Sequence, residues 1–260
     1  MKSIGLALGG GAVLGAAHIG VLAALEERKI KITSIAGTSI GAFIAALYAF
    51  GLTPEEIETK VTDLKWLDTA GFSISKYGLL SNKKLGDMLK KTVGDAQFKD
   101  VEIPLAVVAT DIGTCEKVVL KEGNVAESVM ASSCIPGIFI PVEIGSRLLV
   151  DGGLVENVPI SPLKEMGAEM IMGVDINAKR KYQKPDDIID VLANALDLAI
   201  DNATRIQTEG ADVLITPKLS AYNRADVEMV HDLVKEGYDA VHEAIREIEQ
   251  TDGWQSYNKE

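Results

Sequence analysis

The sequence lacks the features that mark secreted and membrane-spanning proteins. It has no run of roughly 18 or more apolar residues, so we expect no membrane-spanning helix. Its first eight residues run straight into glycines and lack the basic, apolar and small-residue segments of a secretory signal. It has two cysteines, Cys115 and Cys134, too few for a fold built on disulfides. We therefore expect a cytoplasmic protein.

Positive charge is also scarce. The 260 residues include 26 Lys and Arg against 38 Asp and Glu, a formal net charge of −12. A chain this acidic is poorly suited to the phosphates of nucleic acids or anionic lipids, so we expect no nucleic-acid partner. The length and the 47% of hydrophobic residues fit one large domain. We predict that residues 1–250 form this domain and that residues 251–260 form a tail.

Short β-branched runs alternate with longer helical stretches along the chain. The predicted strands are 2–8, 33–36, 104–110, 117–120, 147–150, 169–175 and 212–216. The predicted helices are 13–28, 40–50, 83–93, 123–131, 186–206 and 224–249, and another begins at Pro54 after a Thr53 cap. This alternation favours a mostly parallel sheet with helices on both faces. Residues 66–80, which mix aromatics with glycine, are either a flap over a pocket or an ordinary loop.

One serine lies between two glycines in Gly37-Thr38-Ser39-Ile40-Gly41, after a predicted strand and before a predicted helix. A nucleophile elbow requires this setting, because the turn is tight and small residues let neighbouring backbone approach the serine. The helix amino terminus would also favour developing negative charge. The alternative is that Ser39 only caps the helix at 40–50.

A glycine-rich segment, GGGAVLG at 9–15, joins the first predicted strand to the first predicted helix. A dinucleotide fingerprint would need glycine where Leu14 stands, and a phosphate-binding P-loop would need Lys and Ser or Thr after Gly15. Neither nucleotide site fits, so we expect no cofactor. The remaining interpretation is an oxyanion hole made of backbone amides, in which each donor is worth ~3–4 kcal/mol.

Candidates for the base are few. The three histidines are His18, predicted to be buried in the first helix, and His231 and His242, at the edge of the last helix's apolar stripe. Asp151 is better placed, since it ends a predicted strand and two glycines follow it. Strand ends at one edge of such a sheet form sites, and a desolvated carboxylate can act as a general base. The alternative is that Asp151 only caps a turn.

Together these motifs resemble the patatin-like phospholipase family, the plant patatins and their bacterial relatives. The family has a glycine-rich oxyanion loop, a G-x-S-x-G elbow on the next strand–helix turn and a later D-G-G or D-G-A with the dyad aspartate. Here they occur in that order at 9–15, 37–41 and 151–153, and residues 131–141 are similar to the family block before the aspartate. The resemblance covers residues 3–176.

The resemblance implies an α/β fold, a three-layer α/β/α sandwich with a mostly parallel central sheet. It also implies a serine acyl hydrolase of the esterase, lysophospholipase or phospholipase A type, acting on a lipid or a small ester. Such an enzyme is compatible with transient contact with a membrane surface. Ser39 would be the nucleophile and Asp151 the base, the amides of Gly10, Gly11 and Ala12 would hold the oxyanion, and no metal would be required.

The sequence departs from the family at two positions. Bacterial members usually carry Arg or Lys where Leu14 stands, and often glycine where Ala12 stands. A leucine cannot attract phosphate and would add apolar surface if it faces the site. The resemblance therefore implies acyl hydrolysis more firmly than phospholipid hydrolysis, and we expect soluble short-chain esters to be preferred to anionic bilayers.

Two other functions remain open. An α/β-hydrolase could use Ser39, Asp151 and a late histidine, His231 or His242, although the elbow on the second strand is early for that fold. A non-catalytic regulatory or partner-binding module could use the same fold, and Leu14 is the feature that favours it.

Overall fold

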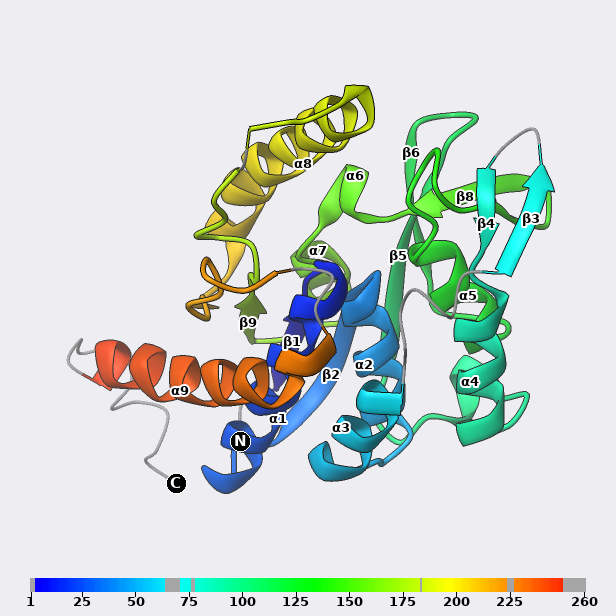
Figure 1. The fold of residues 1–260 in the computed structure, drawn as a ribbon. Helices are drawn as coiled ribbons and strands as arrows, with labels where there is room; N and C mark the ends of the chain where they lie inside the picture. The colour runs from blue at the N-terminus through cyan, green and yellow to red at the C-terminus, as the bar shows by residue number, and fades with distance from the viewer. Residues whose placement is uncertain (1–2, 64–70, 76–77, 183, 224–226, 250–260) are drawn as a thin grey trace.

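The computed structural model describes residues 3–63, 71–75, 78–182, 184–223 and 227–249 (Figure 1). It is built on an eight-stranded sheet in the order β10-β9-β1-β2-β5-β8-β7, with β6 paired to β5. The strands are β1 (Ile4–Leu8), β2 (Ile32–Thr38), β5 (Leu105–Asp111), β6 (Glu116–Leu120), β7 (Val142–Ile144), β8 (Arg147–Asp151), β9 (Met170–Val174) and β10 (Val213–Ile215).

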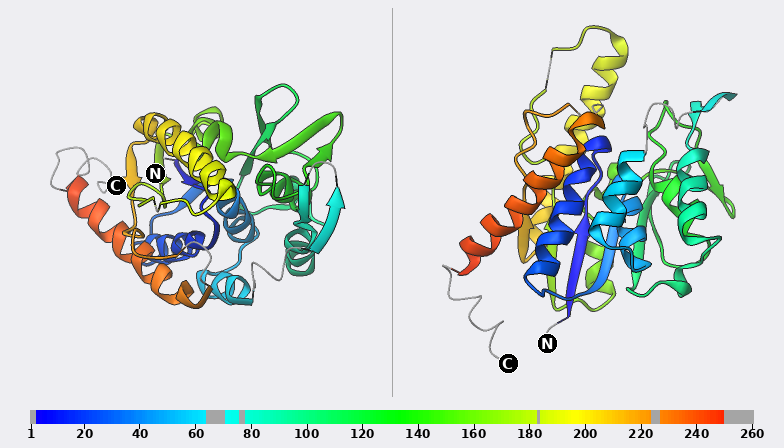
Figure 2. Two further views of the ribbon diagram at one scale, coloured as in Figure 1. Left: turned by 45° about the horizontal axis from the view of Figure 1, so that its top comes forward. Right: turned by 60° about the horizontal axis from the view of Figure 1, so that its bottom comes forward.

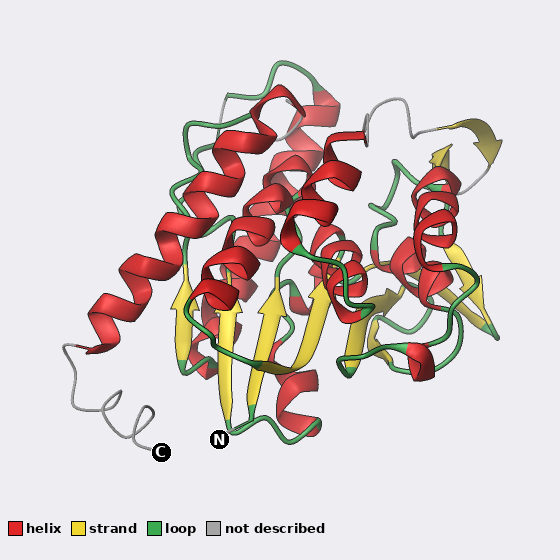
Figure 3. Cartoon of the chain, turned by 90° about the horizontal axis from the view of Figure 1, so that it is seen from below, coloured by secondary structure: helices red, strands yellow, loops and turns green. Residues whose placement is uncertain are grey.

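The sheet is parallel through its centre and antiparallel at one end. Strands β10, β9, β1, β2 and β5 run in the same direction (Figure 3), whereas β6, β7 and β8 pair antiparallel with their neighbours. A separate two-stranded hairpin joins β3 (Gly71–Ser75) to β4 (Gly78–Ser81). The carboxyl ends of the five parallel strands therefore lie at one edge.

The helices and short 3-10 turns connect these strands. They are η1 (Ala12–Ala16), α1 (Ala17–Glu27), α2 (Ile40–Ala49), α3 (Pro54–Asp63), α4 (Lys83–Val93), η2 (Phe98–Asp100), α5 (Val125–Ser132), α6 (Gly153–Glu156), α7 (Ile160–Glu165), α8 (Ile188–Gln207), η3 (Thr208–Gly210), η4 (Val227–Met229) and α9 (Val230–Glu249). Among the described residues, no helix combines the length and the apolar character that crossing a membrane requires.

The two faces of the sheet bury different side chains. Along β1, Leu6 and Leu8 join a large core cluster with α1, α2 and α9, whereas Ala7 points to the other face. There Ala7, Ala36 and Ala106 pair in register across three strands, and this row of small side chains lets the α7 region pack closely through residues such as Leu163. The sheet thus lies between two helical layers, which confirms the predicted three-layer α/β/α sandwich.

Local signals set several boundaries as expected. Thr53 Oγ1 accepts the Glu56 N–H at 3.3 Å, and Glu56 Oε2 accepts the Thr53 N–H at 2.9 Å, so α3 begins with the predicted cap and Pro54. The predicted helix at 13–28 is wrong in its first turn, which is the 3-10 turn η1. A Cβ on Gly15 would lie 2.3 Å from Ile40 Cγ1, so this turn packs tightly against α2.

The predicted helix at 224–249 is likewise α-helical only from Val230, after the 3-10 turn η4, and 224–226 lie outside the described residues. Sequence periodicity also missed β7, α6, α7 and the β3–β4 hairpin.

Part of the expected flap can be described. Residues 64–70 and 76–77 of this region, and the expected tail at 251–260, lie outside the described residues. Leu80 belongs to the second strand of the hairpin, β4. Its N–H donates to the Ile138 carbonyl and its carbonyl accepts the Ile140 N–H, both at 2.9 Å. The hairpin is therefore tied to residues 138–140.

Candidate active site

Ser39 and Asp151 come together because two strands meet end to end. Thr38, the last residue of β2, pairs with Val108 of β5, and Asp151, the last residue of β8, pairs with Ala109. Strand β6 pairs with one edge of β5. Strands β2 and β8 therefore both pair with the opposite edge of β5, and they run toward each other from its two ends. Ser39 follows Thr38, so the predicted serine and aspartate occupy neighbouring positions.

The elbow holds Ser39 in an uncommon backbone conformation. Its φ is +54°, in the left-handed region that a side chain rarely adopts. A Cβ on Gly37 would lie 2.4 Å from Ala42 Cα, and one on Gly41 would lie 2.1 Å from the Leu8 carbonyl oxygen. Both positions therefore need glycine. The Ser39 side chain makes no capping hydrogen bond to α2, which removes the alternative role of a simple helix cap.

A second serine holds the elbow in place. The Ser39 N–H donates to Ser132 Oγ at 2.8 Å, and the Ser132 hydroxyl donates to the Val108 carbonyl at 2.6 Å. Ser132 is fully buried at the end of α5. It therefore links the turn that holds Ser39 to the central strand β5. Sequence reasoning placed Ser132 inside the family-like block at 131–141 but gave it no role.

The glycine-rich loop lies directly against Ser39. A Cβ on Gly10 would lie 3.1 Å from Ser39 Cβ and 2.8 Å from Asn157 Oδ1, so a larger residue here would crowd both side chains. The Gly10 N–H donates to Asn157 Oδ1 at 3.2 Å, and the Gly10 carbonyl accepts from Asn177 Nδ2 at 2.6 Å. Both asparagines are buried. The Gly10 N–H, which we expected to bind the oxyanion, thus already donates to Asn157.

The next two amides of the loop are placed differently. Among the described residues, no partner within the protein accepts the N–H of Gly11 or Ala12. Ala12 also has a positive φ, +53°, at the start of η1. Loop and elbow therefore each contain a non-glycine residue in the left-handed region, and both residues line one pocket.

Asp151 is partly buried and held on several sides. Its Oδ1 accepts the Gly153 N–H at 2.8 Å, which is the turn contact expected of a structural aspartate and also fixes the carboxylate's orientation. Its carbonyl accepts from Thr110 Oγ1 at 2.8 Å. Burial, with the nearby Asp151 charge, raises the pKa of Cys134 to about 12, so that thiol stays protonated.

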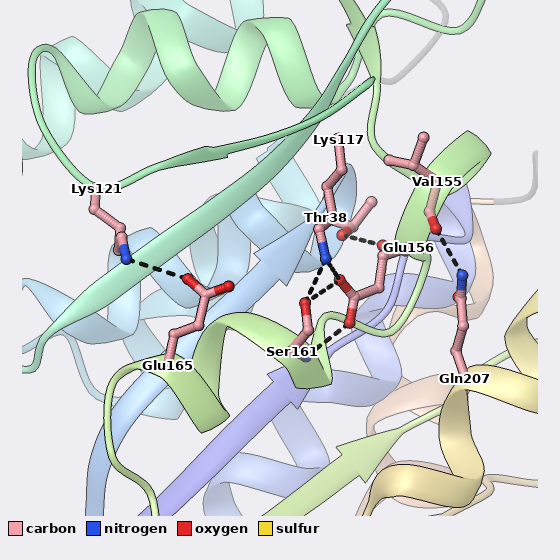
Figure 4. Close-up of polar contacts among 8 residues, drawn as sticks. All are labelled: Thr38, Lys117, Lys121, Val155, Glu156, Ser161, Glu165 and Gln207. Carbon is pink, nitrogen blue, oxygen red and sulfur yellow. Dashed lines mark hydrogen bonds and ion pairs between the residues drawn. The ribbon is translucent and has the colours of Figure 1, made fainter. Parts of the chain in front are cut away.

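A polar cluster surrounds Glu156, the last residue of α6 (Figure 4). The buried Glu156 carboxylate accepts from Lys117 Nζ at 2.9 Å and from Ser161 Oγ at 2.6 Å. Its backbone carbonyl accepts from Thr38 Oγ1 at 3.0 Å. Glu156 therefore connects the segment after Asp151 to Thr38, the last residue of β2.

The elbow, the glycine-rich loop and Asp151 line a pocket of about 400 Å³, the Ser39 pocket. Ser39, Asp151 and the loop residues 10–12 contribute to it, together with Asn157 and Asn177. The remaining wall is mainly apolar, formed by Val13, Ile40, Leu80, Leu85, Ile135, Pro136, Ile138, Phe139, Leu154, Leu196 and Ile200. A larger hollow of about 490 Å³ along α9 is lined mainly by charged residues, and it includes His242 but neither Ser39 nor Asp151.

None of the three histidines lines the pocket that contains Ser39 and Asp151. His18 is fully buried, its Nε2 lies 2.7 Å from the Gly9 carbonyl, and burial lowers its pKa to about 4. The ring is therefore neutral and donates to the loop, which confirms a buried, hydrogen-bonded role. His231 is exposed on α9 near Glu58, and His242 accepts from Arg28.

Leu14 does not face the Ser39 pocket. It is buried and lines a smaller neighbouring hollow of about 60 Å³ with Lys179, Arg180 and Lys181. Of these residues, Arg180 also lines the Ser39 pocket. Among the described residues, no group of three or more His, Cys, Asp or Glu side chains is arranged to hold a metal ion.

Comparison with known proteins gives the family. The model of the patatin-like phospholipase family matches residues 6–164, more than half of the chain. The chain belongs to this family. Patatin-like relatives include an uncharacterised NTE family protein of Mycobacterium tuberculosis, 33% identical over 208 residues. That match covers 78% of this chain and 57% of the relative, so the chain spans little more than half of the mycobacterial protein's length.

Other relatives and structures are more distant. Lysophospholipase NTE1 of Saccharomyces cerevisiae is 30% identical over 191 residues, which cover 68% of this chain and 11% of the yeast protein. The structure of VipD from Legionella pneumophila matches with a TM-score of 0.56 at 15% identity, covering 95% of this chain and 67% of VipD. The type III effector ExoU matches with a TM-score of 0.51 at 12% identity, over 95% and 53% of the two chains. These two structures support the patatin-like fold.

Proposed function

We propose that this patatin-like chain is a serine acyl hydrolase that cleaves carboxylic esters of lipids through a Ser39–Asp151 dyad. The family and the relatives named as lysophospholipases support lipid ester hydrolysis as the class of reaction. The observation that carries the finer assignment is the end-to-end meeting of β2 and β8 beside β5. It brings an elbow serine and a strand-end aspartate into one pocket.

The reaction would proceed through an acyl-enzyme. Asp151 accepts the Ser39 hydroxyl proton while Oγ attacks the acyl carbonyl carbon. The tetrahedral intermediate then breaks its bond to the alcohol oxygen, which leaves with the proton from Asp151. In the second half, a water molecule gives a proton to Asp151 and attacks the acyl-enzyme. The fatty acid leaves, and Ser39 regains its proton.

The amides of Gly11 and Ala12 would stabilise the negative charge on the carbonyl oxygen. Each such donor is worth ~3–4 kcal/mol in the transition state. The amino terminus of α2 begins directly after Ser39, and its dipole favours negative charge at the same place. Gly10 would then act by positioning the loop, because Asn157 and Asn177 hold both of its backbone polar groups.

The apolar wall of the pocket suits an acyl chain, and no observation favours the regulatory alternative. The sequence-based ground for that alternative was Leu14, which in the structure packs away from the Ser39 pocket. A leucine at position 14 leaves Ser39, Asp151 and the amides of Gly11 and Ala12 in place. The same position means that Leu14 gives no support to a preference for neutral esters.

Fatty acid release from a lysophosphatidylcholine and from a soluble short-chain ester tests the proposal. Wild-type protein should hydrolyse both, and Ser39→Ala should hydrolyse neither. Ser133→Ala is a matched control, because Ser133 lines the same pocket and its buried hydroxyl has no hydrogen-bond partner among the residues that the structure describes. Ser133→Ala should keep its activity. Equal activity of Ser39→Ala and wild type would refute the dyad.

A further inference from the structure

Exposed hydrophobic side chains are concentrated on one helix. Among the described residues, nine large hydrophobic side chains are exposed, and five of them lie on α8. These five are Ile188, Val191, Leu192, Leu198 and Ile206. Ile188 and Leu192 have exposed fractions of 74% and 65%. Single exposed apolar residues are normal on a protein surface, but such a group on one element marks an interaction site.

Four of these residues form a stripe at the beginning of the helix. Ile188, Val191, Leu192 and Leu198 lie within three turns, and the exposed Ala195 continues the spacing of three and four residues. We call these four residues the α8 apolar face. This part of α8 extends past the carboxyl ends of the strands (Figure 2, α8 in yellow). The Ser39 pocket is lined by residues that follow shortly after two of these strand ends, Gly10 after β1 and Ser39 after β2.

The opposite sides of α8 are already used, so the apolar face is held outward. Leu196 and Ile200 line the Ser39 pocket. On the polar side, Arg180 Nη1 lies 2.7 Å from Asp197 Oδ2, and Arg180 Nε lies 3.3 Å from Asp201 Oδ2. The Tyr182 hydroxyl donates to Asp201 at 2.6 Å. This anchoring fixes the rotation of the helix.

The charges on α8 and on the whole chain limit which kinds of surface can bind the apolar face. Helix α8 carries Asp190, Asp197 and Asp201, its one basic residue is Arg205 in the last turn, and the whole chain has a net charge of −12. An anionic membrane would repel this helix. A basic protein would be attracted to the acidic side, but that side is turned to Arg180. The apolar face is complemented best by a surface with an apolar interior and an outer layer of no net charge.

We propose that the α8 apolar face inserts into the surface of a zwitterionic lipid layer and thereby brings the mouth of the Ser39 pocket to the lipid. The inference rests on the proposed function for its choice of a lipid partner, because one helix carries both the pocket wall and the exposed stripe. A helix that is apolar on one side and polar on another binds at the interface in proportion to the apolar area it buries. The apolar face and the pocket wall would then form one route for the acyl chain.

The test measures co-sedimentation with phosphatidylcholine vesicles, using Ser39→Ala as the parent so that the lipid is not consumed. Adding Ile188→Ser and Leu192→Ser should weaken binding about tenfold or more. Val191→Ser with Leu198→Ser, on the same face, should act in the same direction. Ile206→Ser is the matched control, since Ile206 is 69% exposed in the last turn of the same helix. It should change binding less than about twofold.

Three results would overturn the inference. These are equal vesicle binding by the parent and both double variants, binding that requires added phosphatidylserine, and no binding to phosphatidylcholine at all. Sedimentation velocity adds a fourth: a dimer that the double variants convert to monomer would make the face a contact between copies. In Ser39-intact protein, the double variants should keep turnover of a soluble ester and lose turnover of vesicle lipid. Vesicle binding without any esterase activity would instead refute the proposed function alone.

Discussion

The Ser39 N–H donates to Ser132 Oγ at 2.8 Å, and the Ser132 hydroxyl in turn donates to the Val108 carbonyl at 2.6 Å. Val108 is the β5 residue opposite Thr38, directly before the elbow. One buried hydroxyl thus satisfies the backbone of the strained residue and ties it to the strand that also pairs with β8. The elbow depends on a residue 93 positions away in the chain.

Replacing Ser132 with alanine should loosen this turn. The change leaves the Ser39 N–H without its acceptor, which costs ~1–3 kcal/mol when the group is buried. We expect kcat for a soluble ester to fall about tenfold or more, with little change in KM, because the nucleophile is misplaced. Ser128→Ala is the control, since Ser128 is buried on the same helix and its hydroxyl donates to the Asn124 carbonyl rather than to the elbow. Full kcat in Ser132→Ala would show that the contact has no role in positioning Ser39.

Asn157 should matter through the glycine-rich loop. Asn157→Asp keeps an acceptor for the Gly10 N–H but places a carboxylate beside the position where negative charge develops. We expect kcat/KM to fall about 100-fold, because the charge opposes the oxyanion in a desolvated site. Asn82→Asp is a demanding control, since Asn82 is also buried in the pocket wall but bonds to the Met130 carbonyl. Similar losses in both variants would indicate a general effect of charge in the pocket.

Asp151 should be required as the base, and the exposed histidines should not. Asp151→Asn should lower esterase activity by ~10³-fold or more, because a dyad has no third member to compensate. His231→Ala and His242→Ala should stay active, since neither side chain lines the pocket. Loss of kcat in either folded histidine variant would favour a Ser-Asp-His triad instead.

His18 should make stability depend on pH. Its folded pKa of about 4 lies below the ordinary value of 6.5, so the unfolded chain binds the proton more readily. Folding stability therefore falls as the pH drops from 6.5 to 4, by about 3 kcal/mol for this group. His18→Gln should lack this part of the slope in urea unfolding measured across that range. Identical slopes in the two proteins would mean that His18 takes up its proton without loss of stability.

The sequence predicted the parts of the site that local pattern encodes. Glycine spacing around Ser39 and the glycines after Asp151 mark turns, and a turn needs only a few neighbouring residues. The contacts that hold those turns were not predictable, because Asn157 lies 147 positions from Gly10 and Asn177 lies 167 positions from it. A single sequence contains no signal that pairs such residues.

The direction of β8 was also hidden, although the strand itself was predicted at 147–150. Its apolar residues fit a parallel or an antiparallel strand equally well. Only the antiparallel course along β5 brings Asp151 opposite Ala109, beside Ser39. The hydrogen bond of the Gly10 amide was not predictable for the same reason, since its acceptor comes from the segment after β8.

The most direct test of the dyad is to locate the serine that reacts with a fluorophosphonate. We expect one labelled peptide, carrying Ser39, in wild-type protein and in Ser133→Ala. We expect no label in Ser39→Ala and strongly slowed labelling in Asp151→Asn. Intact-protein mass spectrometry followed by peptide mapping reads out each case. A label on any other residue, or a label that survives Ser39→Ala in folded protein, would contradict the assignment of Ser39 as the nucleophile.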